Sequence, residues 1–294
     1  MTKSKIVSVD EAVAEIPDGA KVALGGWIFN SQPMALVRAL IRKGARDLHL
    51  IPAPGSIAPD MLIGAGCAAS TVCVFISFEQ FGLAPQFRRA AESGSIKVLE
   101  LDGPALAGGL RAAACDLPYG LIPDMCTDLP RVNPEAYRPM PRVAGERPML
   151  KVPAIHLDVA LLHAQQADEL GNVQYFGAPF FDVLMAQTAK KVIVSVDRIV
   201  STEIIRKTNH LTKLPSALVH AVVEAPFGAH PTSSAGLYDA DEKHLAGYVK
   251  MSASPDSFAQ YLEDYVTGVA NHDDYRKRIG NPRLGEAVSG KAVV

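Results

Sequence analysis

The chain is poor in cysteine and in aromatic side chains: its 294 residues include four cysteines, and only 6% of them are aromatic. The cysteines show no CxxC spacing and lie in stretches of apolar or small residues: Cys67, Cys73, Cys115 and Cys126. This spacing argues against a disulfide framework and is typical of a reducing compartment. We therefore expect four buried thiols in a cytoplasmic protein.

Neither an excess of one charge nor a clear membrane segment is present. The chain has 29 Lys and Arg residues and 31 Asp and Glu residues, so no basic stripe is available for nucleic acid. Residues 61–78 carry no formal charge, but their glycines, alanines and hydroxyl residues argue against membrane insertion. The N-terminus lacks the apolar run of a signal peptide. We expect neither nucleic acid nor membrane as a partner.

Motifs for common cofactors are also missing. The first predicted strand is followed by GGWIF at residues 25–29, which does not match GxGxxG, and no glycine loop precedes a Walker-type lysine. His156 and His163 are seven positions apart on one predicted strand, so their side chains point to opposite faces and form no metal-binding pair. The chain also lacks a GxSxG motif, which would indicate a hydrolase with a serine nucleophile. The sequence thus predicts no NAD, ATP, metal or other permanently bound cofactor.

What the chain does contain is a repeated alternation of short apolar runs and amphipathic segments. Such an alternation is typical of βαβ units, and nearly continuous apolar strands indicate a sheet covered on both faces. We predict an α/β fold with an open, mostly parallel sheet and helices on both faces, as a single domain over residues 1–294. Strands are expected at residues 21–24, 47–51, 71–76, 96–101, 154–164, 191–196 and 218–223. Helices are expected at residues 33–43, 85–93, 106–114, 179–189, 241–251 and 255–266.

Two segments depart from this alternation. Residues 117–149 contain seven prolines and show no helical or strand periodicity. A connection of this length inside a compact domain is usually a functional or interface-covering segment, so we expect it to contact a partner. Residues from 281 onward are expected to form a loose polar tail.

Polar residues follow three of the predicted strands, at the edge where open α/β sheets bind ligands. Ser77, Phe78, Glu79 and Gln80 combine an acid and an amide with aromatic walls, which suits a small acyl ligand. Burial beside the aromatic rings would raise the pKa of Glu79 and make it a base or nucleophile. The simpler interpretation is a solvated acid that begins a loop, and it is favoured.

The other two clusters are equally open to a structural interpretation. Residues 163–174 include Gln165 and Asn172, and form either a surface that orients a polar ligand or an ordinary turn with its own hydrogen bonds. In residues 224–231, Glu224 and His230 form either an acid/base pair or part of a rigid turn. Two prolines and a glycine favour the turn.

The order of these segments, from about residue 20 to residue 266, resembles the A subunit of family I CoA-transferases, of the glutaconate CoA-transferase type. The similar segments are residues 25–33, 60–64, 87–90, 109–111, 128–130, 163–172 and 224–231. The resemblance implies transfer of CoA between small, dicarboxylic or other, acids, with a CoA thioester as substrate. It also implies a glutamate nucleophile on a separate B subunit, an α2β2 assembly and no metal.

By this resemblance, the chain contributes substrate-binding groups and no catalytic residue of its own. Gly25 and Gly26 would allow close approach of the backbone after the first strand. Ser77, Phe78, Glu79 and Gln80 would line the acyl pocket. Gln165 and Asn172 would order the edge that faces the B subunit.

A steroid-ring hydrolase shares this fold and two-chain pattern, and it carries an essential acid on its A subunit. When the two sequences are aligned, that acid falls near Gly103, and the adjacent acids are Glu100 and Asp102. The alternative function is therefore opening of a carbon–carbon bond in a cyclic CoA thioester. Glu79, Glu100 and Asp102 are the candidate catalytic acids of this chain. A third interpretation is a scaffold that only completes a partner's fold.

Overall fold

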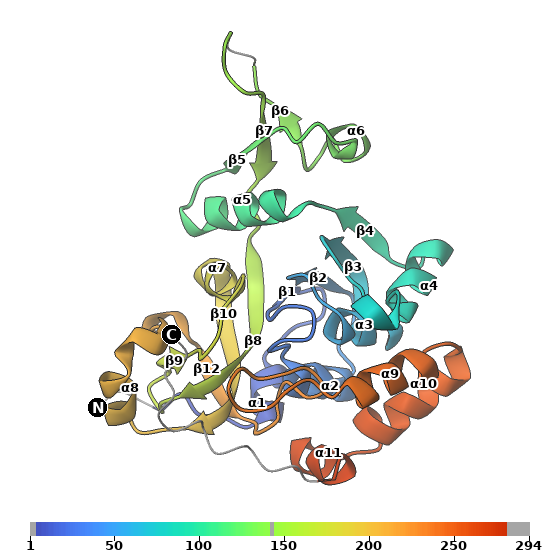
Figure 1. Ribbon diagram of the computed structural model, residues 1–294, viewed down its shortest axis with the longest axis vertical. Helices are drawn as coiled ribbons and strands as arrows, with labels where there is room; N and C mark the ends of the chain where they lie inside the picture. The colour runs from blue at the N-terminus through green and yellow to red at the C-terminus, as the bar shows by residue number, and fades with distance from the viewer. Residues whose placement is uncertain (1–3, 142–143, 281–294) are drawn as a thin grey trace.

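A nine-stranded sheet forms the centre of the molecule (Figure 1). The computed structural model describes residues 4–141 and 144–280, so the tail predicted from residue 281 lies outside the described residues. Parallel strands run in the order β12-β10-β8-β1-β2-β3-β4, and β9 and β11 add antiparallel pairs beside the end of β8. Their bounds are β1 (Lys21–Leu24), β2 (Leu48–Pro52), β3 (Ala68–Cys73), β4 (Lys97–Glu100), β8 (Leu157–Ala167), β9 (Val173–Gln174), β10 (Ala189–Ile199), β11 (Thr212–Leu214) and β12 (Ala221–Glu224).

Helices cover both faces of this sheet, which confirms the predicted α/β class. One face packs on α1 (Val9–Ala14), α2 (Met34–Lys43), α3 (Ile57–Gly64), α9 (Glu242–Met251) and α10 (Pro255–Leu262). The other face packs on α5 (Gly103–Ala114) and α7 (Asp182–Thr188). The remaining helices are α4 (Pro85–Ser93), α6 (Leu129–Val132), α8 (Thr202–Lys207) and α11 (His272–Arg278).

Helix α2 shows how the sequence sets these elements. Pro33 directly precedes the helix, and Gly44 ends it with a left-handed φ of 74°, a conformation that glycine adopts without steric cost. Eight consecutive residues of α2 are buried, because the helix packs against the sheet and against α1 and α3. Such burial is typical of a helix that packs between a sheet and other helices. The helix predicted at residues 33–43 is therefore confirmed.

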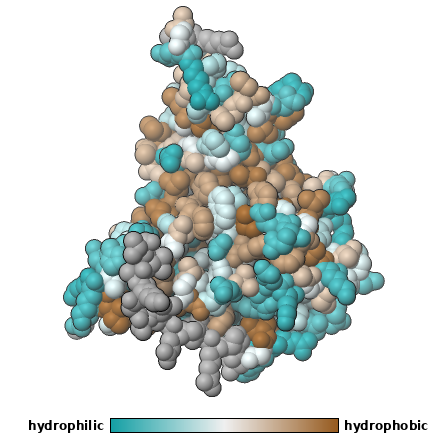
Figure 2. All heavy atoms as spheres, viewed as in Figure 1, coloured by the Kyte–Doolittle hydropathy of each residue, from teal (hydrophilic) through white to brown (hydrophobic). Residues whose placement is uncertain are grey.

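The proline-rich segment forms a small antiparallel sheet of its own. Strands β5 (Tyr119–Pro123), β6 (Arg138–Pro139) and β7 (Met149–Pro153) pair in the order β5-β7-β6 and project beyond α5 (Figure 1). A third apolar cluster joins this sheet to α5. Figure 2 shows apolar side chains gathered across the middle of the molecule, at the level of α5. The prolines hid these strands from the sequence pattern, since proline cannot donate to a ladder.

Three predicted strands are displaced. The strand expected at residues 71–76 is β3 and ends at Cys73, because it pairs in register with β2 and β4 and then leaves the sheet. The strand expected at residues 154–164 runs to Ala167, because β10 pairs with it to its end. The strand expected at residues 218–223 begins at Ala221, after a short 3-10 turn. His156 therefore lies before β8 and is exposed.

The expectation of four buried thiols is wrong. Cys67 is buried and Cys73 is half-buried, and burial raises the pKa of both thiols to about 11. Cys115 and Cys126 are exposed, because one ends α5 and the other lies in the loop before α6. Across residues 4–141 and 144–280, no helix combines the length and the apolar character needed to cross a membrane.

Candidate active site

Five loops gather where the parallel strands end, and we call them the carboxyl-edge loops: residues 25–32, 53–56, 74–84, 175–182 and 225–236. Backbone hydrogen bonds join four of them, and the Gly26 amide joins residues 25–32 to Asp182 in the fifth. The amide of Ile28 donates to the carbonyl of Pro54 at 2.7 Å, and that of Ser77 donates to Gly55 at 3.1 Å. Ser31 donates to Ser233 at 2.8 Å. The loops therefore form one connected surface, although they are distant in sequence.

Backbone strain is concentrated in these loops. Of the eight non-glycine residues with positive φ among the described residues, five lie here: Ile28 (47°), Ser31 (50°), Glu79 (50°), Phe180 (44°) and Phe227 (60°). A left-handed φ is disfavoured for β-branched and aromatic residues, and costs on the order of 1–3 kcal/mol each. Strain of this kind persists where the surroundings enforce it, and it clusters at functional sites.

Asp182 holds the glycine pair that follows β1. Gly26 has a φ of 84°, and its amide donates to Asp182 Oδ1 at 2.8 Å. A Cβ atom on Gly25 would lie 2.5 Å from the same oxygen, so this position admits no side chain. The hydroxyl of Tyr175 donates to Asp182 Oδ2 at 3.0 Å. Burial raises the pKa of Asp182 to about 7. Burial is the largest effect, and the two hydrogen bonds lower the pKa by less than burial raises it.

Sequence reasoning missed Asp182, since it sits inside the helix expected at residues 179–189. The signal was present, because an acid follows two phenylalanines in an otherwise apolar segment. A buried carboxyl group at the start of α7 must find partners, and one of them, the Gly26 amide, lies 156 positions away along the chain. Gly25 and Gly26 are in close contact with Asp182 of this chain, and their approach to a substrate stays a prediction.

Residues 77–80, predicted to line an acyl pocket, do not all face the same way. Phe78 is fully buried, and its ring stacks on Tyr248 with centroids 5.3 Å apart. Glu79 and Gln80 are exposed on a 3-10 turn, and the hydroxyl of Ser77 donates to the carbonyl of Gly82 at 3.2 Å. Glu79 is thus a solvated acid at the start of a loop, the interpretation favoured from the sequence. The alternative of a buried, activated acid does not hold, because Phe78 turns toward the core.

Gln165 and Asn172 do not act together. Gln165 is buried in β8, where its amide donates to Ser234 Oγ at 3.0 Å and its oxygen accepts from the amide of Phe176 at 2.9 Å. Asn172 lies in the turn after β8 and donates to Asp168 Oδ2 at 2.9 Å. Gln165 thus fastens two carboxyl-edge loops to the sheet, whereas Asn172 stabilises an ordinary turn.

A buried serine, histidine and aspartate lie beneath the loops, another feature that sequence reasoning missed. His163 is within 3.0 Å of Ser195 Oγ and 3.1 Å of Asp197 Oδ2. All three are fully buried, and Ser195 donates its hydroxyl to the Leu162 carbonyl at 3.2 Å. A nucleophile needs access and a free activated hydroxyl, so this trio is structural. Asp197 also accepts from the Phe227 amide at 2.8 Å, which anchors a strained loop.

Comparison with known proteins assigns the family. The sequence profile of the coenzyme A transferase family matches residues 6–225, about three quarters of the chain. The chain belongs to the coenzyme A transferase family. Enzymes of this family use CoA thioesters as substrates, and ligands of open α/β folds bind at the carboxyl edge of the sheet. The resemblance read from the ordered segments is thereby confirmed.

Relatives within the coenzyme A transferase family differ in their named activities. The chain is 35% identical to the "Cholesterol ring-cleaving hydrolase IpdA subunit" of Rhodococcus jostii (strain RHA1), over 94% of this chain and 96% of that protein. It is 31% identical to the A subunit of glutaconate CoA-transferase from Acidaminococcus fermentans, over 96% of this chain and 93% of that one.

Solved structures confirm the fold. The crystal structure of glutaconate coenzyme A-transferase from Acidaminococcus fermentans matches with a TM-score of 0.88 at 29% identity, covering 94% of this chain and 93% of that chain. The decarboxylase AibA/AibB matches with a TM-score of 0.78 at 37% identity, covering 90% of this chain and 98% of that chain. The predicted CoA-transferase fold is therefore correct.

The two other candidate acids follow β4. Asp102 is the N-cap of α5 and accepts from the Ala105 amide at 2.7 Å, and its own amide donates to Tyr137 Oη at 2.8 Å. Glu100 is exposed at the end of β4. Gly103 is the first residue of α5, and a Cβ atom there would meet nothing within 4 Å. Asp102 therefore has a local structural function, and Glu100 faces solvent.

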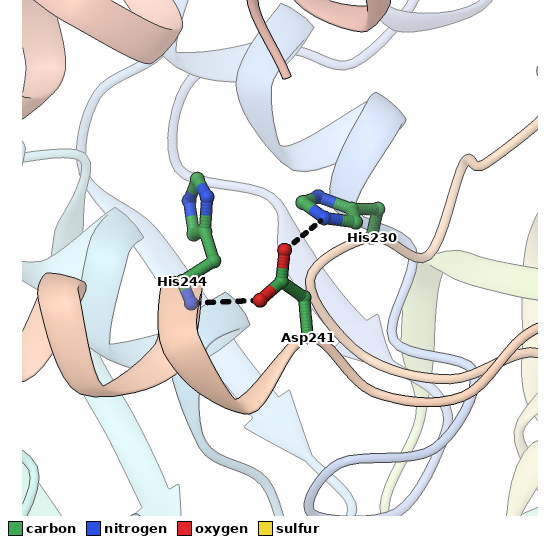
Figure 3. Close-up of side chains that lie close together, drawn as sticks. All are labelled: His230, Asp241 and His244. Atoms are coloured by element: carbon green, nitrogen blue, oxygen red, sulfur yellow. Dashed lines mark hydrogen bonds and ion pairs between the residues drawn. The ribbon is translucent and has the colours of Figure 1, made fainter. Parts of the chain in front are cut away.

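A second group of ionisable residues lies behind residues 225–236, and we call it the Arg38 cluster: Arg38, His230, Tyr261 and Tyr275, which are buried, and Asp241 and His244, which are half-buried. Figure 3 shows Asp241 between the two histidines. Its carboxylate lies 3.2 Å from His230 Nε2 and accepts from the His244 amide at 2.9 Å. Glu224 instead accepts from the Ile199 amide at 3.3 Å. The possible Glu224–His230 pair does not form.

The Arg38 cluster offers metal-binding atoms next to a buried positive charge. Among the described residues, His230, Asp241 and His244 are the one trio whose potential ligand atoms lie within 4.8 Å of one another. Burial, followed by Arg38 for His230 and by His230 for His244, lowers the pKa of His230 to about 4 and that of His244 to about 3. Both rings are neutral at pH 7, but the Arg38 charge opposes a metal cation, and tyrosine hydroxyls occupy one nitrogen of each ring.

Proposed function

We propose that this chain is the A subunit of a heteromeric CoA-transferase, and that its carboxyl-edge loops form one side of an acyl-CoA site shared with a B subunit. The observation that carries the proposal is the state of the two acids in these loops. Asp182 is buried and hydrogen-bonded, and its pKa of about 7 leaves it only partly ionised at pH 7, whereas Glu79 is exposed without aromatic shelter. Neither matches a sheltered carboxylate nucleophile, so the partner supplies it.

The proposed reaction uses a glutamate of the B subunit. Its carboxylate oxygen attacks the thioester carbonyl and the C–S bond breaks. The products are an acyl–glutamyl anhydride and the free CoA thiolate. The thiolate then attacks the glutamyl carbonyl, which releases the donor acid and forms glutamyl-CoA. An acceptor acid reverses both steps. The relative of Acidaminococcus fermentans, named as an A subunit, supports the two-chain arrangement.

The residues of this chain would position the thioester and exclude water. Gly25 and Gly26 keep the turn after β1 free of side chains, and Asp182 fixes that turn by accepting from the Gly26 amide. Half-buried rings such as Trp27 and Phe29 provide a low-dielectric wall, in which donors to a developing oxyanion act more strongly than in water. An α2β2 assembly in the cytoplasm, without a permanent cofactor, completes the proposal.

Reconstitution tests this proposal. The chain is co-expressed with the product of the adjacent gene, the complex is purified, and CoA transfer from acetyl-CoA or succinyl-CoA to added acids is measured. The complex is expected to transfer CoA, and the isolated chain is expected to be inactive. Mass spectrometry of the quenched complex should find the CoA thioester on a carboxylate of the B subunit. A thioester on a carboxylate of this chain, or a fully active lone chain, would contradict the proposal.

A matched pair of variants tests the Ser77–Gln80 segment. Glu79→Gln should alter the preference among acids more than the unfolding temperature, because the exposed carboxylate lies on a strained turn of the carboxyl-edge loops. Glu203→Gln is the control, since Glu203 is an exposed acid in the first turn of α8. Identical kinetics of the two variants would remove this segment from the site.

The second candidate function is opening of a ring in a cyclic CoA thioester. The observation that favours it is the 35% identity to the Rhodococcus jostii protein, named as a cholesterol ring-cleaving hydrolase. Glu100 and Asp102 are then the acids to test, next to the start of α5. Formation of a ring-opened product without any acceptor acid would favour this function. Loss of that activity in Glu100→Gln, with α5 intact, would identify Glu100 as the essential acid.

A further inference from the structure

The aromatic residues of this chain are concentrated in the carboxyl-edge loops. Eight of the ten phenylalanines and the single tryptophan lie in these loops, although aromatic residues make up only 6% of the chain. They are Trp27, Phe29, Phe75, Phe78, Phe81, Phe176, Phe180, Phe181 and Phe227. The same loops contain no lysine and no arginine. Phe78 and Phe227 are buried, so the other seven rings are those at or near the surface, and the loops supply no lysine or arginine to pair with a carboxylate.

Contacts between rings hold the exposed Phe180 and the half-buried rings beside it in place. Trp27 stacks on Phe180 with centroids 5.1 Å apart and planes inclined by 19°, and on Phe181 at 6.3 Å. Phe29 contacts Phe81 at 5.9 Å. Residues 27–29 thus connect the rings of one neighbouring loop with those of another. The wall is preorganised, which lowers the entropy lost when an apolar ligand binds.

Phe180 combines an exposed ring with a strained backbone. It is 41% exposed, and its backbone is held at a φ of 44°, which is strained for an aromatic residue. Exposing a large apolar side chain at a strained position adds nothing to folding. Such a residue is better explained by contact with a ligand or partner.

Taking the proposed CoA-transferase function as given, we infer that the site selects an apolar, branched or cyclic monocarboxylic acyl group. A second carboxylate on the acyl chain would lie among rings without a cation from this chain, and it would lose its hydration uncompensated. The exposed Glu79 adds a negative charge at the rim and repels such a dianion. The inference departs from the dicarboxylic acids that the resemblance implies.

A competition assay with the reconstituted complex tests this inference. Cyclohexanecarboxylate, 3-methylbutanoate, succinate and glutarate are compared as CoA acceptors, and the kcat/KM ratio of cyclohexanecarboxylate to glutarate is measured. We expect a ratio of at least about tenfold, in the range that one well-fitted apolar group provides. Phe180→Ala should reduce that ratio several-fold, because it removes an exposed ring of the proposed acyl wall. A preference for glutarate in the unaltered complex would overturn the inference.

Tyr119→Ala is the matched control. Tyr119 is 40% exposed, as Phe180 is, but it lies in β5 of the small sheet and outside the carboxyl-edge loops. Its removal should leave the ratio unchanged. If Phe180→Ala instead weakens the complex in analytical ultracentrifugation while the ratio per complex stays the same, the rings serve docking of the partner and the inference is overturned.

Binding measurements separate this inference from the proposed function. Thermal shifts of the complex are compared with cyclohexanecarbonyl-CoA and glutaryl-CoA, without any acceptor. If no acid accepts CoA but cyclohexanecarbonyl-CoA gives the larger shift, the transferase proposal falls and the acyl preference stands. If transfer occurs and glutaryl-CoA gives the larger shift, the transferase proposal stands and the acyl preference falls.

Discussion

The carboxyl-edge loops and the Arg38 cluster share one segment of chain and differ in almost everything else. Residues 225–236 contribute strained Phe227 and hydrogen-bonded Ser234 to the first region, and His230 to the second. From residue 228 to residue 280, no non-glycine residue has a positive φ. Both regions contain buried ionisable groups, but only the loops combine strain with exposed rings. Burial of polar groups alone therefore does not mark a site.

Burial shifts the pKa of Asp182 in the loops and that of His230 in the Arg38 cluster in opposite directions. Burial raises the pKa of Asp182 to about 7 in the loops, whereas it lowers that of His230 to about 4 in the Arg38 cluster. Each shift favours the neutral form of a buried group. Arg38, by contrast, keeps its charge although it is 2% exposed, and its guanidinium lies 3.5 Å from the centroid of the Tyr275 ring. A shifted pKa thus follows from burial, and it indicates chemistry only where a ligand can enter.

The largest effect should come from filling the turn after β1. Gly25→Ala places a Cβ atom 2.5 Å from Asp182 Oδ1 and 2.6 Å from Leu162 Cδ2, so buried groups must move. We expect a loss of about 3 kcal/mol in the free energy of unfolding and at least about 100-fold in kcat. Urea unfolding and the transfer assay measure the two losses. Gly103→Ala is the control, because nothing lies within 4 Å of the added atom. Equal effects of the two variants would refute the interpretation of the turn.

Asp182→Asn should change the pH dependence of stability. Its folded pKa of about 7 exceeds the unfolded value of 3.8, so between these pH values the folded state binds the extra proton. The Asp182 contribution to stability is therefore present below pH 4 and is lost as pH rises toward 7. The variant, whose amide keeps the acceptor for Gly26, removes that loss. Its stability should gain up to about 1.4 kcal/mol per pH unit relative to the unaltered chain in this window.

Thermal melts of the complex from pH 4 to pH 8 measure this difference. Asp158→Asn is the control, because Lys190 lowers the pKa of that carboxyl group below its ordinary value of 3.8, so its pH profile should run nearly parallel to that of the unaltered chain across this range. The Asp158 contribution is present above its unfolded pKa and is lost as pH falls below it. Parallel pH profiles for Asp182→Asn and the unaltered chain would show that Asp182 is ionised in the folded state.

The sequence was sufficient for the architecture and insufficient for the site. Apolar runs and proline or glycine boundaries predicted β1 and α2, since these signals are local. The end of β8 was misplaced because Gln165 and Gln166 look like loop residues, whereas inside the sheet Ser234 and Gln174 on other segments satisfy their amides. Contacts across more than a hundred positions, such as that between Gly26 and Asp182, leave no periodic signal. The exposure of Glu79 depended on the direction of Phe78, which a single sequence does not fix.

The smallest effect is expected in the Arg38 cluster. The Arg38 guanidinium donates to the His230 carbonyl at 3.1 Å, while its Nε and Nη2 atoms have no hydrogen-bond partner among the described residues. Replacement of a poorly paired buried charge by an apolar residue of similar length is often neutral. We therefore expect Arg38→Met to change the free energy of unfolding by less than about 1 kcal/mol and to leave acyl preference unchanged.

The histidines should report the lost charge directly. Arg38 lowers the pKa of both His230 and His244, after burial itself, so Arg38→Met should raise both values toward 6.5 without reaching it. Because a depressed histidine pKa makes stability fall as pH drops from 6.5, the variant should lose less stability between pH 6.5 and 4. Histidine NMR titration measures the shifts, with Arg88→Met on exposed α4 as the control. A changed acyl preference in Arg38→Met would mean that the two regions are coupled through residues 225–236, and their separation would then be wrong.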